Sequence, residues 1–263
     1  MKRSCFTLVE LLVVIATIAL LTAILLPSLQ NSRRQARAAL CGSNVKQLVF
    51  GLAMYETENE IFPYAFHKTL TPPPGGYPGD FAYDRTGWWW FNYIVDYSRK
   101  DYGRASVIWC PSRQISGRSL KDNVLCGNYG VNQSICKSSH GRKNWEDFVG
   151  TPLRSSDILH PGQTLLIVDS GYSLISWWHA TDVPPIPLGS TIEDSAYVPG
   201  LEINKDKNLW PGQEWDAING RHPNRTVNIG FVDGHVSRKK TDDLFVEKIA
   251  EDYKNKSPLW QPK

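Results

Sequence analysis

The chain has 263 residues and a formal net charge of +3, from 29 basic and 26 acidic side chains. Such a balance lacks the concentrated positive charge that marks a nucleic-acid-binding protein. A hydrophobic content of 41% and a charged content of 21% are ordinary for a folded globular protein and exclude an intrinsically disordered chain.

The first predicted element is an apolar helix over Phe6–Leu26, preceded by Lys2 and Arg3 and followed by Pro27. As a helix, these 21 residues are about 32 Å long, at about 1.5 Å per residue. This length matches the hydrocarbon core of a bilayer, about 30 Å, so the segment is long enough to span a membrane. Basic residues lie on both sides of the run, and they do not decide its orientation.

The apolar run contains one carboxylate, Glu10. An isolated charge in a membrane helix is unfavourable, by about 2.5–3.5 kcal/mol at the helix centre and by less near an end. A residue kept at such a cost needs a partner of opposite charge, and no basic residue lies within the run. We therefore expect Glu10 to pair with another subunit in an assembly.

Three interpretations of this N-terminus compete: a cleavable secretory signal, an ordinary membrane anchor with an incidental glutamate, and a prepilin. The apolar stretch is long for a secretory signal, and LLPSL at 25–29 is a poor cleavage site. FTLVELLVVI at 6–15 resembles the class III signal of type IV prepilins and type II secretion pseudopilins. We favour the third interpretation, a structural subunit of a type II secretion pseudopilus or a type IV pilus-like filament.

The resemblance implies that a prepilin peptidase cuts the chain between Cys5 and Phe6 and methylates the new amino group of Phe6. Cys5 stands where the family usually has glycine. Glu10 and Pro27 match a glutamate and a proline typical of the family, and the glutamate is expected to pair with the amino terminus of a neighbouring subunit. The expected partners are the peptidase, the inner membrane and copies of the chain or related pilins, with no nucleic acid. The expected location is a single pass through the inner membrane, with the C-terminal domain in the periplasm or at the cell surface.

A helical pattern continues beyond Pro27 to about Glu60. Proline removes one hydrogen bond from the helix, so Pro27 is expected to bend it. Apolar residues recur at steps of three and four and form one stripe, made of Cys41, Val45, Leu48, Leu52 and Tyr55. The predicted fold class is α+β, with a long kinked N-terminal helix packed on an antiparallel β-sheet domain. The expected parts are a leader (1–5), a transmembrane or filament-core helix (6–26), its amphipathic half (27–60), a globular pilin-like head (61–253) and a tail (254–263).

Local signals predict the elements of the head. Thr164–Asp169 is a strongly apolar strand. Asp233-Gly234, between the apolar runs Thr226–Val232 and His235–Ser237, is a strong hairpin signal. The other predictions are a loop over 62–87, a short helix over 88–97, a strand over 107–111, a turn over 128–132, a surface excursion over 180–214, a helix over 241–253 and a frayed tail from Lys254.

The chain has five cysteines, of which Cys5 leaves with the leader if the cut occurs. The even number that remains favours two disulfide bonds in an exported domain. From their placement we favour the pairs Cys41–Cys110 and Cys126–Cys136. Buried free thiols are the alternative, and a zinc site is disfavoured because no C-x2-C pair is present.

His222, Asp233 and Gly234 resemble a C-terminal motif of pilin-like proteins of the planctomycete and lentisphaera type, a histidine followed by nine residues and Asp-Gly. Here ten residues separate the histidine from the aspartate. His222, Asp233 and His235, with Asp169 on another strand, also have side chains suited to a metal site. We favour instead a turn role for the aspartate and backbone hydrogen bonds for His222, and we expect no metal and no cofactor.

No G-x-S-x-G, H-E-x-x-H or P-loop sequence is present, so we expect no enzyme. The chain has ten tryptophans, with clusters at 88–90 and 177–178. Such clusters suit either the packing of a core or the stacking of sugars on a surface. The alternative function is therefore a membrane-anchored surface protein that binds carbohydrate or mediates adhesion and does not polymerise.

Overall fold

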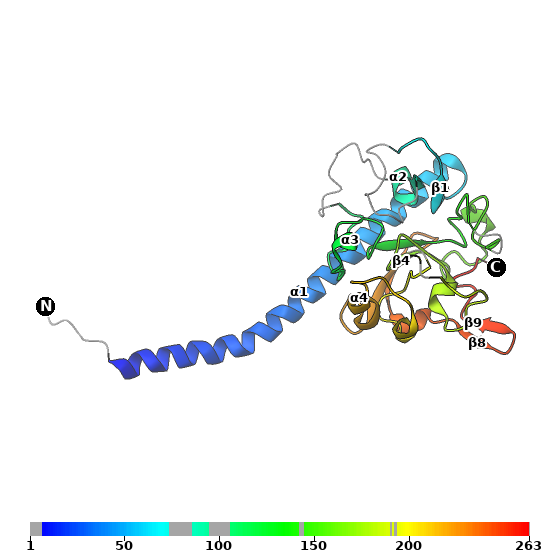
Figure 1. The fold of residues 1–263 in the computed structure, drawn as a ribbon. Helices are drawn as coiled ribbons and strands as arrows, with labels where there is room; N and C mark the ends of the chain where they lie inside the picture. The colour runs from blue at the N-terminus through cyan, green and yellow to red at the C-terminus, as the bar shows by residue number, and fades with distance from the viewer. Residues whose placement is uncertain are drawn as a thin grey trace.

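One long helix, α1, runs from Leu8 to Asn59, and its N-terminal half extends away from the rest of the molecule (Figure 1). The structure is a computed structural model that describes residues 7–73, 86–94, 106–141, 145–189, 191 and 194–262. Pro27 lies inside α1 without ending it, and the ribbon is visibly curved. Glu60 follows the helix in the left-handed conformation (φ 63°), which confirms the predicted end.

The head lies against the C-terminal half of α1 and is built on a five-stranded sheet in the order β5-β3-β4-β6-β7. Neighbouring strands are antiparallel, except that β3 and β5 are parallel. A long N-terminal apolar helix on a mainly antiparallel sheet confirms the predicted α+β fold class. The strands are β3 (Tyr129–Asn132), β4 (Leu165–Asp169), β5 (Leu174–Ile175), β6 (Thr226–Phe231) and β7 (Val236–Lys240).

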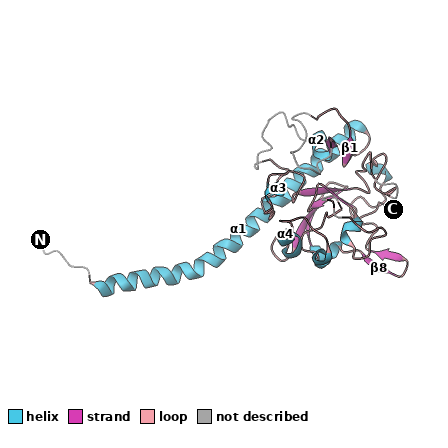
Figure 2. Cartoon of the chain, viewed as in Figure 1, coloured by secondary structure: helices cyan, strands magenta, loops and turns pink. Residues whose placement is uncertain are grey.

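Shorter elements surround this sheet (Figure 2). Two ribbons of two strands each are β1 (Phe66–Lys68) with β2 (Gly87–Trp89), and β8 (Glu247–Ile249) with β9 (Asp252–Lys254). The short α-helices are α2 (Trp90–Ile94), α3 (Arg118–Lys121) and α4 (Glu214–Asn219). The 3₁₀ helices are η1 (Ser155–Asp157), η2 (Trp177–Ala180), η3 (Glu202–Asp206) and η4 (Thr241–Leu244).

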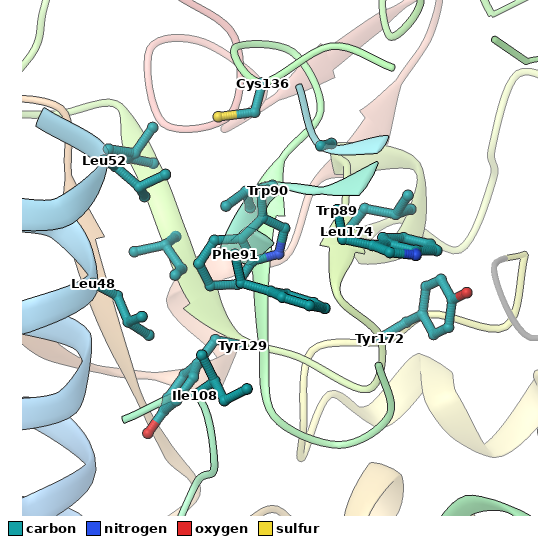
Figure 3. Close-up of a cluster of buried hydrophobic side chains, with 14 of the residues drawn as sticks. Leu48, Leu52, Trp89, Trp90, Phe91, Ile108, Tyr129, Cys136, Tyr172 and Leu174 are labelled. Carbon is teal, nitrogen blue, oxygen red and sulfur yellow. The ribbon is translucent and has the colours of Figure 1, made fainter. Parts of the chain in front are cut away.

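The apolar stripe predicted on α1 packs on the head. Cys41, Val45, Leu48 and Leu52 are buried, and Tyr55 at the end of the stripe is half-buried. Aromatic side chains of β2 and α2 and apolar residues of the sheet fill the space opposite the helix (Figure 3). Burying one such aliphatic side chain contributes about 1.5–3 kcal/mol, so this packing is a main source of the attachment of this half of α1 to the head.

The C-terminal end of the chain completes a second apolar cluster on the same strands. Trp260 is fully buried, and its indole N–H donates to the carbonyl oxygen of Leu244 at 3.0 Å. The backbone N–H of Leu165, at the start of β4, donates to the carbonyl oxygen of Leu259 at 2.9 Å. The expectation of a frayed tail from Lys254 is therefore wrong.

Two predictions next to the sheet are also wrong. The stretch 128–132, expected as a turn, forms β3 inside the sheet. A Cβ atom at Gly130 would lie 2.7 Å from the carbonyl oxygen of Tyr172. The absence of a side chain at Gly130 therefore allows the two backbones to approach this closely. The stretch 107–111, expected as a strand, forms turns and bends and is held by a hydrogen bond to the side chain of Asn128.

The expected helix over 241–253 is instead η4 followed by β8 and β9. The N–H of Val246 donates to the carbonyl oxygen of Ala180 at 2.9 Å, a tertiary bond that takes the place of a helical one. The expected surface excursion over 180–214 is wrong in its middle, because Tyr197 is fully buried there. In both places long-range contacts override the local pattern.

The predictions around the first ribbon are only partly right. Within the expected loop over 62–87, Phe66–Lys68 forms β1 and pairs with β2. Phe66 and Trp89 stack across this pair with their ring centroids 4.9 Å apart. The helix expected over 88–97 begins only at Trp90, and its last three positions lie outside the described residues.

Candidate functional site

The N-terminal half of α1, residues 8–37, is exposed along its whole length, and we call it the protruding half. Its hydroxyls bond internally, since Thr17 and Thr22 donate to carbonyl oxygens of the preceding turn. Among the described residues, α1 is the one helix long and apolar enough to cross a membrane, a criterion of length and composition. Its exposed large apolar side chains are Leu8, Val9, Leu11, Leu12, Val13, Val14, Ile15, Ile18, Leu20, Leu21, Ile24, Leu25, Leu26 and Leu29.

Glu10 lies in the first turn of α1 and forms a capping box with Thr7. Its Oε2 accepts from the backbone N–H and from the hydroxyl of Thr7, both at 2.8 Å. Within the described part of the chain, no ion pair includes this carboxylate. Cys5 and Phe6, the predicted processing site, lie outside the described residues.

Four side chains from distant segments converge where α1 crosses the sheet. One comes from α1, one from the end of β4, one from the loop before α3 and one from the loop before β6. All four residues are buried, and one possible ligand atom from each lies within 4.8 Å of the other three. We call this set the helix–sheet cluster, made of Cys41, Cys110, Asp169 and His222.

The contacts inside the helix–sheet cluster are short. The sulfur of Cys41 is 3.3 Å from the sulfur of Cys110 and 3.1 Å from Oδ1 of Asp169. Oδ2 of Asp169 is 3.1 Å from Nε2 of His222 and accepts the backbone N–H of Asn228 at 2.7 Å. The cluster therefore ties α1 to two strands of the sheet.

In the cluster, the pKa values of Asp169 and Cys110 are lowered and that of His222 is raised, so the charged forms of these groups are favoured. The thiol of Cys41 is the exception, because its pKa is raised. Burial raises the pKa of Asp169, but the charge and hydrogen bond of His222 outweigh it and lower the pKa. Burial lowers the pKa of His222, yet Asp169 raises it to about 9. Burial also raises the pKa of Cys110, but hydrogen bonds to Cys41 and His222 lower it to about 6. Burial raises the pKa of Cys41.

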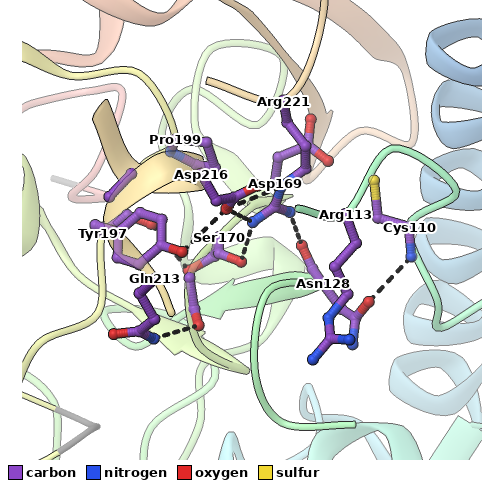
Figure 4. A network of polar contacts seen from close by, with 12 residues as sticks. Cys110, Arg113, Asn128, Asp169, Ser170, Tyr197, Pro199, Gln213, Asp216 and Arg221 are labelled. Atoms are coloured by element: carbon purple, nitrogen blue, oxygen red, sulfur yellow. Dashed lines mark hydrogen bonds and ion pairs between the residues drawn. The ribbon is translucent and has the colours of Figure 1, made fainter. Parts of the chain in front are cut away.

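A buried ion pair lies beside the cluster (Figure 4). The guanidinium of Arg221 is 2.6 Å from Oδ2 of Asp216, and both side chains are fully buried. It also donates to the carbonyl oxygens of Asn128 at 2.7 Å and Ser170 at 2.9 Å. These bonds fix the loop that carries His222. Arg221 stands next to His222 in the sequence, but no local pattern indicates the buried ion pair that it forms with Asp216.

The structure separates the members of the C-terminal motif. His222 joins the cluster before β6, whereas Asp233 and Gly234 form the turn after it, so the hairpin prediction is confirmed. Oδ1 of Asp233 is 2.6 Å from Nδ1 of His235, and the carbonyl oxygen of Gly234 accepts from Nζ of Lys46 on α1 at 2.7 Å. The described contacts join His222 to the aspartate of β4 and not to Asp233 or His235.

The predicted disulfides stay predictions. The sulfurs of Cys41 and Cys110 are adjacent, but 3.3 Å exceeds the bond length of about 2.05 Å. Cys126 and Cys136 are both buried, and burial raises the pKa of the Cys136 thiol.

The tryptophan clusters pack inside the head. Trp89, Trp90, Trp177 and Trp178 are all at most 5% exposed. Trp178, for example, meets Phe148 edge to face with the centroids 5.0 Å apart. The interpretation of these four tryptophans as a sugar-stacking surface is therefore wrong, and it no longer supports a carbohydrate-binding protein.

Over 89 residues, the chain is 26% identical to the type II secretion system core protein G of Pseudomonas aeruginosa. The match covers 33% of this chain and 63% of that protein, which is less than two thirds of its length. No protein-family model matches the chain, and no solved structure matches it. The weak similarity and the apolar N-terminal helix together are consistent with a pilin-like secretion subunit that has a single-pass membrane anchor.

Proposed function

We propose that the chain is a pilin-like structural subunit, without catalytic activity, that assembles through α1 into a type II secretion pseudopilus or a type IV pilus-like filament. The observation that carries the proposal is the protruding half of α1, a continuous exposed apolar helix attached to a folded head (Figure 1). Apolar surface in water costs about 25 cal/mol per Å², so lipid first and neighbouring helices later cover it. The similarity to core protein G supports the same assignment.

In this proposal, a prepilin peptidase cuts between Cys5 and Phe6 and leaves a methylated ammonium group on Phe6. Glu10 of a neighbouring subunit binds that ammonium. Within one chain the carboxylate is bonded to the neutral groups of Thr7. A cation stabilises a carboxylate in an apolar medium more strongly than a hydroxyl does, because charge-assisted hydrogen bonds are about twice as strong as neutral ones. The pair sets the axial register between subunits.

The proposed arrangement places α1 once through the inner membrane, with the head on the periplasmic or surface side. Residues 6–26 form the membrane and filament core, and residues 27–60 connect them to the head. The peptidase and other copies of the chain or related pilins are the partners. Such a subunit supplies shape and contacts to a filament.

Two substitutions separate the charge of Glu10 from its role in capping the helix. Glu10→Gln keeps a hydrogen-bond acceptor for Thr7 and removes the charge, whereas Thr7→Ala removes the hydroxyl and keeps the charge. In a host with the peptidase and the filament machinery, we expect Glu10→Gln to insert in the membrane and remain monomeric. Thr7→Ala is expected to assemble as the unchanged chain does. The measurement is the amount of chain in the sheared filament fraction.

Mass spectrometry of the same fractions shows whether the leader has been cut and the new N-terminus methylated. The expected N-terminal peptide begins with methylated Phe6. An intact Met1 together with monomers alone would instead favour a membrane anchor that does not polymerise. Normal assembly of Glu10→Gln would refute the intersubunit pair.

A further inference from the structure

We propose that the helix–sheet cluster binds one zinc ion, which joins α1 to the sheet of the head. Cys41 and Cys110 supply two sulfur ligands, Asp169 an oxygen and His222 the Nε2 nitrogen. The site is structural: it has four protein ligands and no place left for substrate. Asp233 and His235, which also have side chains suited to a metal, lie in the turn after β6 and are not part of this site.

The distances between the donor atoms fit a tetrahedral ion. With zinc–sulfur bonds of about 2.3 Å and zinc–nitrogen or zinc–oxygen bonds of about 2.0 Å, tetrahedral ligands lie about 3.8 Å (sulfur–sulfur), 3.5 Å (sulfur–oxygen) and 3.3 Å (oxygen–nitrogen) apart. The sulfurs are 3.3 Å apart. The carboxylate of Asp169 meets the other ligands with different oxygens, since Oδ1 is 3.1 Å from the sulfur of Cys41 and Oδ2 is 3.1 Å from Nε2 of His222. Outward movements of about 0.5 Å or less bring these three pairs to tetrahedral spacing, and the ligand atoms of all four residues lie within 4.8 Å of one another.

Nε2 of His222 has one acceptor and one donor among its polar neighbours. This nitrogen is 3.1 Å from Oδ2 of Asp169, an acceptor, and 3.1 Å from Nδ2 of Asn228, a donor. A ring nitrogen either donates or accepts, so it satisfies only one of these two neighbours. A zinc ion bound to the lone pair of Nε2 and to the carboxylate takes the place of the contact between them, and the Asn228 amide keeps Oδ2 of Asp169 as an acceptor at 3.4 Å.

The types of ligand favour zinc over calcium and magnesium. Two sulfurs and an imidazole suit zinc and not calcium or magnesium, which prefer oxygen ligands. The second sphere of a zinc site orients its ligands by hydrogen bonds. Here the backbone N–H of Asn228 donates to Asp169 at 2.7 Å, and the hydroxyl of Tyr129 lies 3.2 Å from the sulfur of Cys41.

A disulfide between the same cysteines explains less of the cluster. A bond between the sulfurs, like zinc binding, removes the thiol proton that Cys41 donates to Oδ1 of Asp169 at 3.1 Å, but the disulfide gives that oxygen no new partner. It gives no reason for a fully buried histidine and carboxylate beside the two sulfurs. Zinc uses all four side chains, and it excludes the disulfide because both need the same sulfur atoms.

The test uses the full chain, purified in detergent from membranes of an expressing bacterium in buffer that contains zinc. Elemental analysis is expected to give about one zinc per chain. After the zinc is replaced by cobalt, the visible spectrum is expected to show the bands of a tetrahedral cobalt–thiolate site. Neither measurement depends on filament assembly, so the zinc proposal and the proposed function fail separately.

Matched variants locate the ion. Cys110→Ser is expected to lose most of the zinc and the cobalt–thiolate bands. Cys136→Ser, the same change at a buried thiol outside the cluster, is expected to retain both. Full retention of zinc by Cys110→Ser would overturn the assignment.

A second measurement needs no variant. The unchanged chain is denatured without reductant, treated with a thiol-alkylating reagent and mapped by mass spectrometry. Alkylation of both Cys41 and Cys110, in a chain that carried zinc when native, supports the site. A disulfide between the two residues, or two alkylated thiols in a chain that carried no zinc, overturns it.

Discussion

Gly230 of β6 lies directly against Val49 of α1. A methyl group at Gly230 would lie 2.2 Å from Cγ2 of Val49 and 2.8 Å from Cγ2 of Ile167 on β4. The missing side chain is therefore what allows the helix to approach the sheet this closely. The same approach brings Cys41 to the helix–sheet cluster and Lys46 to the carbonyl oxygen of Gly234.

Gly230→Ala is expected to lower the free energy of unfolding of the head by about 1–3 kcal/mol or more, because the helix must move away from the sheet. Denaturant unfolding of the purified chain, followed by tryptophan fluorescence, measures the change. The double variant Gly230→Ala/Val49→Ala removes the nearest clashing atoms, so its cost is expected to be smaller than the sum of the two single costs. Additive costs would show that Val49 does not set the distance.

Arg221→Lys is expected to destabilise the head although the charge is kept. The planar guanidinium of Arg221 pairs with Asp216 and donates hydrogen bonds to the carbonyl oxygens of Asn128 and Ser170. A lysine ammonium on a single stem reaches fewer of these acceptors, and each buried acceptor left without a donor costs about 1–3 kcal/mol.

The matched control is Arg154→Lys. Arg154 is exposed and pairs with Glu60 at 3.6 Å, and such surface pairs contribute about 0–1 kcal/mol. Thermal unfolding of both variants gives the comparison. Equal effects at the two positions would contradict the buried role of Arg221.

Local patterns in the sequence were sufficient to predict the elements whose signals lie within a few residues. The stripe on α1, the helix end near Glu60 and the Asp233-Gly234 hairpin all depend on near neighbours in the chain, and all are confirmed. The carboxy-terminal residues were mispredicted because their structure depends on distant ones. The carbonyl oxygen of Trp260 accepts from the side chain of Asn132, 128 positions earlier, at 2.8 Å.

The helix–sheet cluster was beyond local reasoning for the same reason. Cys41 and Cys110 are 69 positions apart, and Asp169 and His222 are 53 apart. The strand order β3-β4-β6 brings them together, and no spacing motif encodes that order. The sequence did single out all four residues as candidates, in separate groups: the cysteines as a disulfide pair, and His222 with Asp169 as possible ligands.

Acid is expected to destabilise the head through His179. This residue is buried, its Nδ1 accepts the backbone N–H of Ser176 at 3.1 Å, and its carbonyl oxygen accepts from Nζ of Lys207 at 2.6 Å. Burial, together with the charge of Lys207, lowers the pKa of His179 to about 3. The pKa of Lys207 falls to about 7 because of burial, so this neighbour stays charged throughout the acid range.

The direction in which the free energy of unfolding changes with pH follows from the number of protons that each state binds. Between about pH 6.5 and pH 3, the unfolded chain carries a proton on His179 and the folded chain does not. The free energy of unfolding therefore falls as the pH is lowered through this window, by up to about 1.4 kcal/mol per pH unit for this one proton. Asp169 and Asp233, whose pKa values are lowered in the folded state, act in the same direction at lower pH.

Comparison of two variants isolates the part due to His179. His179→Asn keeps an acceptor for Ser176 and cannot bind the proton, so its stability is expected to decline less between pH 6.5 and pH 4.5 than that of the unchanged chain. His160→Asn makes the same change at an exposed position and is expected to decline as the unchanged chain does. Denaturant unfolding at several pH values gives the three profiles. Parallel profiles for all three chains would mean that His179 takes up its proton equally well in the folded and unfolded states, contrary to its burial beside Lys207.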